Sequence, residues 1–373
     1  MTGLPPFVSR FLAACITIGV TLSLAPPATA GSVERRLYVA APGIRNYLEF
    51  GGHGILIYDI DHNYRFLRRI AGAGMNADGD AANVKGIAAN STTQRLYVTT
   101  LQKLACYDLI TDNLLWEKEF EGGCDRLAIT PDGRQLFVPS LEKTHWNIVA
   151  GDDGRILKRL DGFKSAHNTI VALDGRHAYL ADRSSPLLAV VDVDRQEVTR
   201  QIGPFSQSIR PFTINAAGTR VYVCVDELLG FEIGDLTTGK LLQRVSVEGF
   251  NKGPVKRHSC PSHGVGLTPD EREVWVVDAA NQQVHVFDNT LDRPRQLASI
   301  PVREQPGWIA FSLDGRHAWP STGEVIDVAS KRVVTALADR RGTEVHSEKL
   351  IEVQFDGKRV VRVGDQFGLG RAR

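Results

Sequence analysis

The sequence has few of the features from which many protein functions are recognised. Its formal net charge is only +1, from 44 Lys and Arg against 43 Asp and Glu, which excludes the bulk basic surface that binds nucleic acid non-specifically. It contains no Gly-x-Ser-x-Gly and no His-Glu-x-x-His, so serine hydrolases and zincins have no local support. The glycines between Gly72 and Gly79 match neither phosphate-binding pattern. Local motifs therefore define no enzyme class.

Cysteine is also scarce, at five residues, and one of these, Cys15, lies near the N-terminus. The other four allow three different pairings, and the sequence does not choose between them. They are Cys106, Cys124, Cys224 and Cys260. Two of them, at 106 and 224, lie inside strand-like runs, where buried free thiols are the simplest expectation.

Long apolar runs are missing except at the N-terminus. Phe11 to Leu24 is apolar, follows Arg10, and precedes the small-x-small sequence Ala28-Thr29-Ala30. At about 14 residues the run is shorter than the ~20 needed to cross a bilayer, and the pattern is that of a secretory signal peptide. We expect residues 1–30 to be this signal and residues 31–373 to form one domain. The expected location is periplasmic or secreted, with no integral membrane segment after signal removal.

The sequence does contain a repeat. A short apolar strand, a tight turn and a strand with an aromatic residue recur, most clearly in Leu127–Val138 and Ile309–Trp319, whose turns contain Asp-Gly. Seven aromatic residues mark the second strand of each copy: Tyr38, Tyr97, Phe137, Tyr179, Tyr222, Trp275 and Trp319. The copies are about 40 to 45 residues apart, with four short strands each, which is the period of a propeller blade. The sequence therefore predicts an all-β, seven-bladed β-propeller with four-stranded blades; a β-sandwich is the alternative.

The two ends of the repeat indicate how the ring closes. The first copy of the repeat begins at Arg36-Leu37-Tyr38-Val39 and has no first strand before it. Near the C-terminus, Leu350–Phe355 has the pattern of a first strand, but no second strand follows it. We expect the C-terminal strand to join the N-terminal blade, which would remove open sheet edges.

The second strands resemble the YVTN-type seven-bladed propeller family, whose motif is best matched by Leu96–Thr100, Leu37–Ala40 and Val221–Cys224. The resemblance covers nearly all of residues 34–367 and implies the propeller fold. The wider group is similar to lactonase-type propellers, amine dehydrogenase heavy chains and surface-layer propellers. It therefore spans enzymes, redox subunits and binding proteins, and implies no single activity.

A site is expected on one face of the propeller. The long loops 41–54, 71–85 and 248–263 all connect second to third or fourth to first strands, which lie at the same end of the channel. The candidate residues of this channel mouth are His53, His167, His263, Asp182, Asp226, Asp278, Arg126 and Arg210. They offer acid–base groups or metal ligands; alternatively, the Asp residues cap turns and the basic loop is simply solvated.

The segment His258-Ser259-Cys260-Pro261-Ser262-His263 is the densest cluster of metal-ligand types. His258, Cys260 and His263 could bind a divalent metal such as zinc; a disulfide or a packed loop is the alternative. No other cofactor is predicted.

The sequence favours a non-catalytic function, because no nucleophile–base pair stands out. We expect a scaffold that binds a small-molecule or protein ligand through its long-loop face, acts as a monomer and binds no nucleic acid. One alternative is a lactonase-like hydrolase with a metal or His/Asp site at the channel mouth. The other is the propeller subunit of a periplasmic quinoprotein or amine dehydrogenase.

Overall fold

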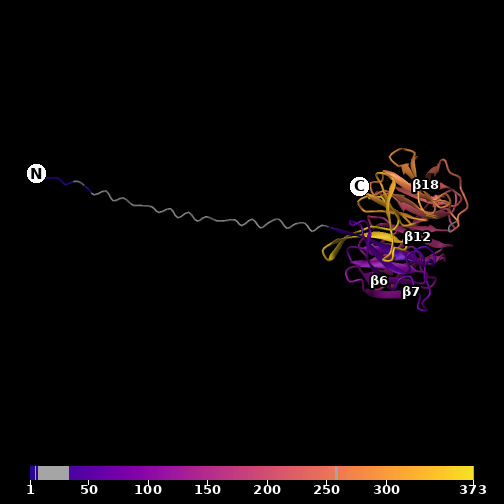
Figure 1. Cartoon of the computed structure of the whole chain (residues 1–373), viewed down its shortest axis with the longest axis horizontal. Helices are drawn as coiled ribbons and strands as arrows, with labels where there is room; N and C mark the ends of the chain where they lie inside the picture. The colour runs from indigo at the N-terminus through magenta and orange to yellow at the C-terminus, as the bar shows by residue number, and fades with distance from the viewer. Residues whose placement is uncertain (5, 7–32, 257–258, 373) are drawn as a thin grey trace. The chain divides into compact units, whose positions relative to one another are not determined.

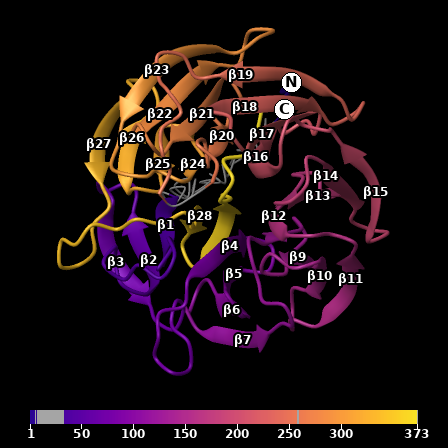
Figure 2. The ribbon, with the colours of Figure 1, turned by 90° about the vertical axis from the view of Figure 1, so that its right-hand side faces the viewer.

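A computed structural model describes residues 1–4, 6, 33–256 and 259–372 (Figure 1). The predicted signal peptide falls almost wholly outside these residues, as does His258. The part from Val33 onward is a compact unit built only from β-strands, which form seven antiparallel sheets. Figure 2 shows these sheets arranged in a ring about a common axis. The predicted seven-bladed propeller is confirmed.

Each blade contributes one strand to the channel wall and three strands outside it. The first strands are β4 (Val84–Asn90), β8 (Ala128–Ile129), β12 (Ala166–Val171), β16 (Ile209–Ile214), β20 (Val265–Leu267), β24 (Ile309–Phe311) and β28 (Leu350–Asp356). The second strands are β5 (Arg95–Thr100), β9 (Gln135–Pro139), β13 (His177–Asp182), β17 (Arg220–Val225), β21 (Glu273–Asp278), β25 (His317–Pro320) and β1 (Glu34–Ala41).

The outer half of each blade follows the same order. The third strands are β6 (Lys103–Asp108), β10 (His145–Ala150), β14 (Leu188–Asp192), β18 (Gly230–Asp235), β22 (Gln283–Asp288), β26 (Glu324–Asp327) and β2 (Gly54–Asp59). The fourth strands are β7 (Leu114–Glu119), β11 (Ile156–Asp161), β15 (Glu197–Ile202), β19 (Leu241–Ser246), β23 (Arg295–Pro301), β27 (Arg332–Ala336) and β3 (Arg65–Ile70).

The ring closes as the sequence predicts. β28 pairs with β1 in an antiparallel register that places Ile351 opposite Tyr38, so the C-terminal strand completes the N-terminal blade (Figure 2). This blade has one strand more than predicted, because β29 (Arg359–Val363) pairs with the inner edge of β28. The extra strand lies inside the first-strand ring.

The core lies between neighbouring blades. All seven aromatic residues that mark the second strands are at most 2% exposed, and each hydrophobic cluster is dominated by two adjacent blades; one, for example, joins Tyr222 of β17 to Phe287 of β22. Burying an aromatic or aliphatic side chain is worth about 1.5–3 kcal/mol. The repeated aromatic position therefore holds the blades to one another.

The C-terminal segment fills one side of the channel. The Gln366 side chain accepts a hydrogen bond from Ile87 N at 3.3 Å and donates one to Leu127 O at 3.1 Å. Two residues later the Gly368 carbonyl accepts from Leu267 N at 2.8 Å and from Thr213 Oγ1 at 3.0 Å. These contacts reach four different first-strand regions, so the segment satisfies backbone and side-chain groups that would otherwise face an open channel.

Candidate functional site

One repeated position places an ionisable side chain at the long-loop end of the channel in six of the seven blades. In each blade the buried aromatic residue of the second strand lies opposite one residue of the first strand. The repeated position lies three residues before that first-strand residue. We call these seven residues the mouth ring: Lys85, Asp125, His167, Arg210, His263, Gly307 and Glu348. Six of the seven are ionisable types.

Local backbone geometry supports this placement in three blades. The β4, β12 and β16 ladders shift register at Val84/Gly86, Ala166/Asn168 and Ile209/Phe212. The extra residues at these bulges include Lys85, His167 and Arg210. A β-bulge re-aims a side chain and is over-represented beside functional sites, which fits side chains turned to the mouth.

Asp125 and His167 form a buried pair. His167 Nδ1 lies 2.7 Å from Asp125 Oδ2, and the other carboxylate oxygen accepts from Arg126 N at 3.0 Å and lies 3.4 Å from Lys85 Nζ. Burial alone would raise the pKa of Asp125, but Lys85 and His167 outweigh it and lower that pKa to about 2. Burial lowers the pKa of His167, against the attraction of Asp125. At neutral pH the pair is a carboxylate and a neutral imidazole, with the ring proton directed to Asp125.

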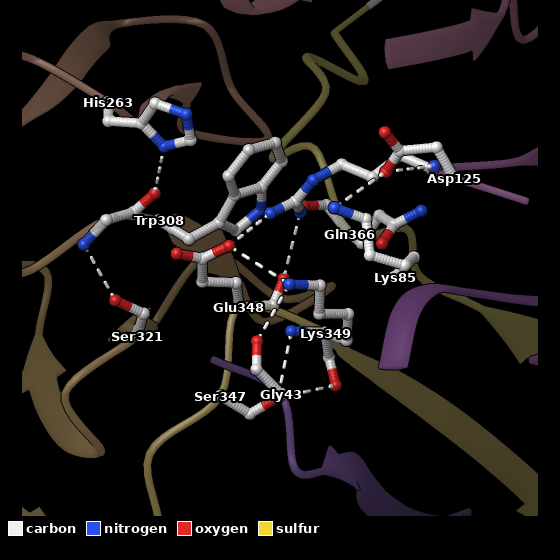
Figure 3. Close-up of polar contacts among 12 residues, drawn as sticks. Gly43, Lys85, Asp125, His263, Trp308, Ser321, Ser347, Glu348, Lys349 and Gln366 are labelled. Atoms are coloured by element: carbon white, nitrogen blue, oxygen red, sulfur yellow. Dashed lines mark hydrogen bonds and ion pairs between the residues drawn. The ribbon is translucent and has the colours of Figure 1, made fainter. Parts of the chain in front are cut away.

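A second buried cluster spans the channel (Figure 3). Arg126 from blade three places its guanidinium 3.4 Å from the ring centroid of Trp308 and donates to the Glu348 carbonyl at 3.2 Å; it also pairs with the Glu348 carboxylate. Lys349 Nζ lies 3.0 Å from that carboxylate and donates to Gly43 O at 2.7 Å. Burial lowers the pKa of Lys349 to about 7, although Glu348 opposes this. One carboxylate thus serves two buried cations.

The remaining ring members are held individually. Arg210 donates two hydrogen bonds to Asp226, at 2.6 and 2.9 Å, and a third to Ser259 Oγ. His263 Nδ1 lies 3.2 Å from the Gly307 carbonyl (Figure 3). Arg210 and Asp226, both candidates from the sequence, therefore form a direct, bidentate ion pair.

Among the described residues, three other predicted candidates make no hydrogen bond to the mouth ring. His53 is exposed on the loop before β2. Asp182 accepts from the backbone N–H groups of Ser165 and Ser184, at 3.0 and 2.8 Å. Asp278 accepts from Asn281 N at 3.0 Å. Both Asp side chains accept from loop amides, as the alternative interpretation expected, but Asp278 also lies 3.1 Å from Nε2 of the buried His285.

Cys260 and His263 are the two predicted metal ligands that the structure describes in the cysteine-containing loop. The buried Cys260 thiol lies 3.1 Å from the Val225 carbonyl, and burial raises its pKa, which opposes the thiolate that metals need. The described part of the chain contains no group of three His, Cys, Asp or Glu able to hold a metal ion. His258 lies outside the described residues. The structure describes four cysteines, which are buried and form no disulfide: Cys106, Cys124, Cys224 and Cys260.

The sequence pointed to Arg126, His167, Arg210 and His263 but not to Asp125 or to the residues that Arg126 contacts, Trp308 and Glu348, with the adjacent Lys349. The repeat could have revealed them. Counting back three residues from the first-strand residue opposite each second-strand aromatic also identifies Lys85, Asp125 and Glu348. Lys349 and Trp308 follow ring positions directly and could have been found in the same way.

No protein-family model matches the sequence, and no curated protein matches it. Among solved structures, the chain is similar to the one described as "Crystal structure of Myceliophteria thermophila Cps50 (Swd1) beta-propeller domain", with a TM-score of 0.57 and 11% sequence identity over 78% of this chain and 94% of that chain. At this identity the likeness shows the propeller fold alone. A helix long and apolar enough to cross a membrane is absent from the described residues.

Proposed function

We propose that this protein is an exported propeller that binds a small polar ligand at the mouth ring. The observation that supports this is the repeated ionisable position. Burying a charge costs several kcal/mol even when it is paired, and a channel that needed only filling would be filled with apolar side chains. Such filling is found in the C-terminal segment, where Phe367 and Leu369 are 3% and 4% exposed.

The chemistry of the ring suits a ligand with both donors and acceptors. Lys85 and Arg210 offer N–H donors, and Glu348 offers carboxylate acceptors. Because Asp125 holds Nδ1 of His167, the Nε2 atom is the one that accepts a hydrogen bond from a ligand. Oxygen-rich small molecules such as hydroxy acids and sugars match this set.

A ligand screen tests the proposal. Sugars, hydroxy acids and amino acids are added to the full chain, and the shift in melting temperature is recorded, since a ligand that binds only the native state stabilises it. We expect at least one class to raise the melting temperature in the wild type but not in His167→Gln or Arg210→Gln. His62→Gln, an exposed histidine outside the ring, is the matched control. Stabilisation that survives both ring substitutions would contradict the proposal.

A second candidate function is a hydrolase that uses the Asp125–His167 pair. A neutral imidazole oriented by a fixed carboxylate is the usual arrangement of a general base, and it fits the lactonase-like alternative without a metal. Lactones and p-nitrophenyl acetate are the test substrates. We expect His167→Gln to lower any observed turnover by about 10²-fold or more, with no change in His62→Gln. Equal turnover in the two variants would exclude this base.

Export and membership of the YVTN-type family complete the proposal. The apolar run with its small-x-small sequence supports cleavage after Ala30, and the seven second strands support the family. N-terminal sequencing of protein recovered from the periplasm or medium tests the first part: a mature chain starting at Gly31 is expected, and retention of Met1 in a cytoplasmic product would overturn it.

A further inference from the structure

A cavity lies at the end of the channel opposite the mouth ring. It has a volume of about 270 Å³ and is bounded by the first strands of blades two to four, by the turns that follow them, and by the C-terminal segment. Its apolar walls include Ile87, Leu127, Ile170, Val363 and Phe367. The cavity exists because β29 and the following residues fill the channel unevenly and leave space beside β4, β8 and β12.

The Gln366 side chain separates this cavity from the mouth. Its amide bridges Ile87 N and Leu127 O, and the backbone carbonyl of Gln366 accepts from Trp308 Nε1, which packs against Arg126. The cavity is therefore a separate site and shares no ring residue with the mouth.

The rim of the cavity is cationic. Arg362 and Arg371 line it together with a single carboxylate, Asp365. Arg371 pairs with that carboxylate and donates to Leu369 O at 2.8 Å, so the one acidic group is already used. Arg362 is exposed and has no ion pair to any described residue. The charge of this rim is complementary to one anionic group.

The edge of the cavity is also unusually apolar for a surface. Val361 and Leu173 are each 42% exposed there, next to the apolar walls. A concave, mostly apolar space with a few polar groups at its opening is the usual form of a small-molecule site.

We propose that this cavity, which we call the turn-end cavity, binds a small amphiphilic anion: one apolar aliphatic or aromatic body with one carboxylate or sulfonate group. The body lies between the first strands and the C-terminal segment, and the anionic group pairs with Arg362. The proposal is independent of the function assigned to the mouth ring.

Two probes that differ only in charge test it. 8-Anilinonaphthalene-1-sulfonate carries the anion and N-phenyl-1-naphthylamine lacks it; both report binding by fluorescence. We expect saturable binding of one molecule per chain for both. Arg362→Gln should weaken the sulfonate probe by about three- to fivefold, the effect of one exposed charge pair, and leave the neutral probe unchanged. Arg359→Gln removes a neighbouring exposed cation that does not line the cavity, and should change neither.

Filling the cavity gives a second measurement. Val363→Phe should weaken both probes by about tenfold or more, because it occupies the space of the apolar body; its fold is checked by circular dichroism. His167→Gln should leave both probes unaffected, which distinguishes this site from the mouth ring. Binding with several molecules per chain, or equal losses in Arg359→Gln and Arg362→Gln, would overturn the proposal, and so would undiminished binding in folded Val363→Phe. If Val363→Phe does not fold, the charge-matched comparison alone decides.

Discussion

Lys349 should make the stability of the propeller rise with pH just above neutrality. In the unfolded chain this lysine keeps its proton up to about pH 10.5, whereas in the folded chain burial lowers its pKa to about 7. Between these values the unfolded state binds one proton more than the folded state, so the free energy of unfolding increases with pH. The full separation corresponds to about 5 kcal/mol, and the slope approaches about 1.4 kcal/mol per pH unit.

The slope is best measured between about pH 7.5 and 8.5. The thiols of the unfolded chain, with a pKa of about 8.5, begin to ionise within this window, whereas burial raises the pKa of folded Cys106 to about 12. Those groups oppose the effect of Lys349, but they do so equally in wild type and variant. Urea unfolding of wild type and Lys349→Met at both pH values gives the required difference. The wild type should gain about 1 kcal/mol more than the variant across the window.

The comparison has an internal control. Lys358→Met removes an exposed lysine and should follow the wild-type slope. Glu348 keeps Arg126 as its partner in Lys349→Met, so the variant changes one titrating group and leaves an ion pair. Parallel pH dependence in wild type and Lys349→Met would show that the buried ammonium keeps its proton in the folded state, and would refute the reasoning.

Three further perturbations test the channel. Arg126→Met leaves the buried Glu348 with one cation in place of two and should cost about 3–5 kcal/mol in urea unfolding; Arg155→Met, at an exposed ion pair, should change stability by no more than about 0.5 kcal/mol. Asp125→Asn should lower the free energy of unfolding by about 2 kcal/mol at neutral pH. The wild-type carboxylate has a pKa near 2 and loses its stabilisation as pH falls from about 4 towards 2, so the stability of the variant should fall less steeply with acid. An unchanged dependence of stability on acid pH would contradict this. Phe367→Ala should lower the free energy of unfolding by about 3–5 kcal/mol, and a neutral result would mean that the C-terminal segment does not support the ring.

The fold was predictable because its information is repeated. Each blade needs a buried aromatic at the same register, and Tyr38, Tyr222 and Trp319 occupy that register although their neighbours differ. Ring closure was predictable for the same reason, since one blade lacked a first strand and one first strand lacked a blade. β29 and the segment after it occur once and have no repeat to align with. Their position depends on unpaired strand edges in the channel, which no local pattern in the sequence reveals.

The site was only half predictable because its contacts join distant blades. His167 was a candidate by its place before a first strand, but its partner Asp125 is 42 residues away, and the partner of Arg126 is 222 residues away. Asp182 was a candidate because it ends a second strand, yet it accepts its hydrogen bonds from the backbone of two loops of its own blade, at Ser165 and Ser184. A carboxylate at a strand end therefore says little until the nearest donors are known.

The two ends of the channel differ for a physical reason. First strands of a propeller present their edges to the axis, and the N–H and C=O groups there must be satisfied or solvated. At the turn end the C-terminal segment satisfies part of them, through Gln366 and Gly368, and brings Phe367 and Leu369 with it. At the mouth no such segment is present among the described residues, and side chains such as Arg126 cross the space in pairs with carboxylates. The repeated first strands thus build a symmetric channel wall, and the C-terminal segment, which occurs once, makes the two ends of the channel different. The mouth holds paired charges, and the turn end holds an apolar cavity with a cationic rim.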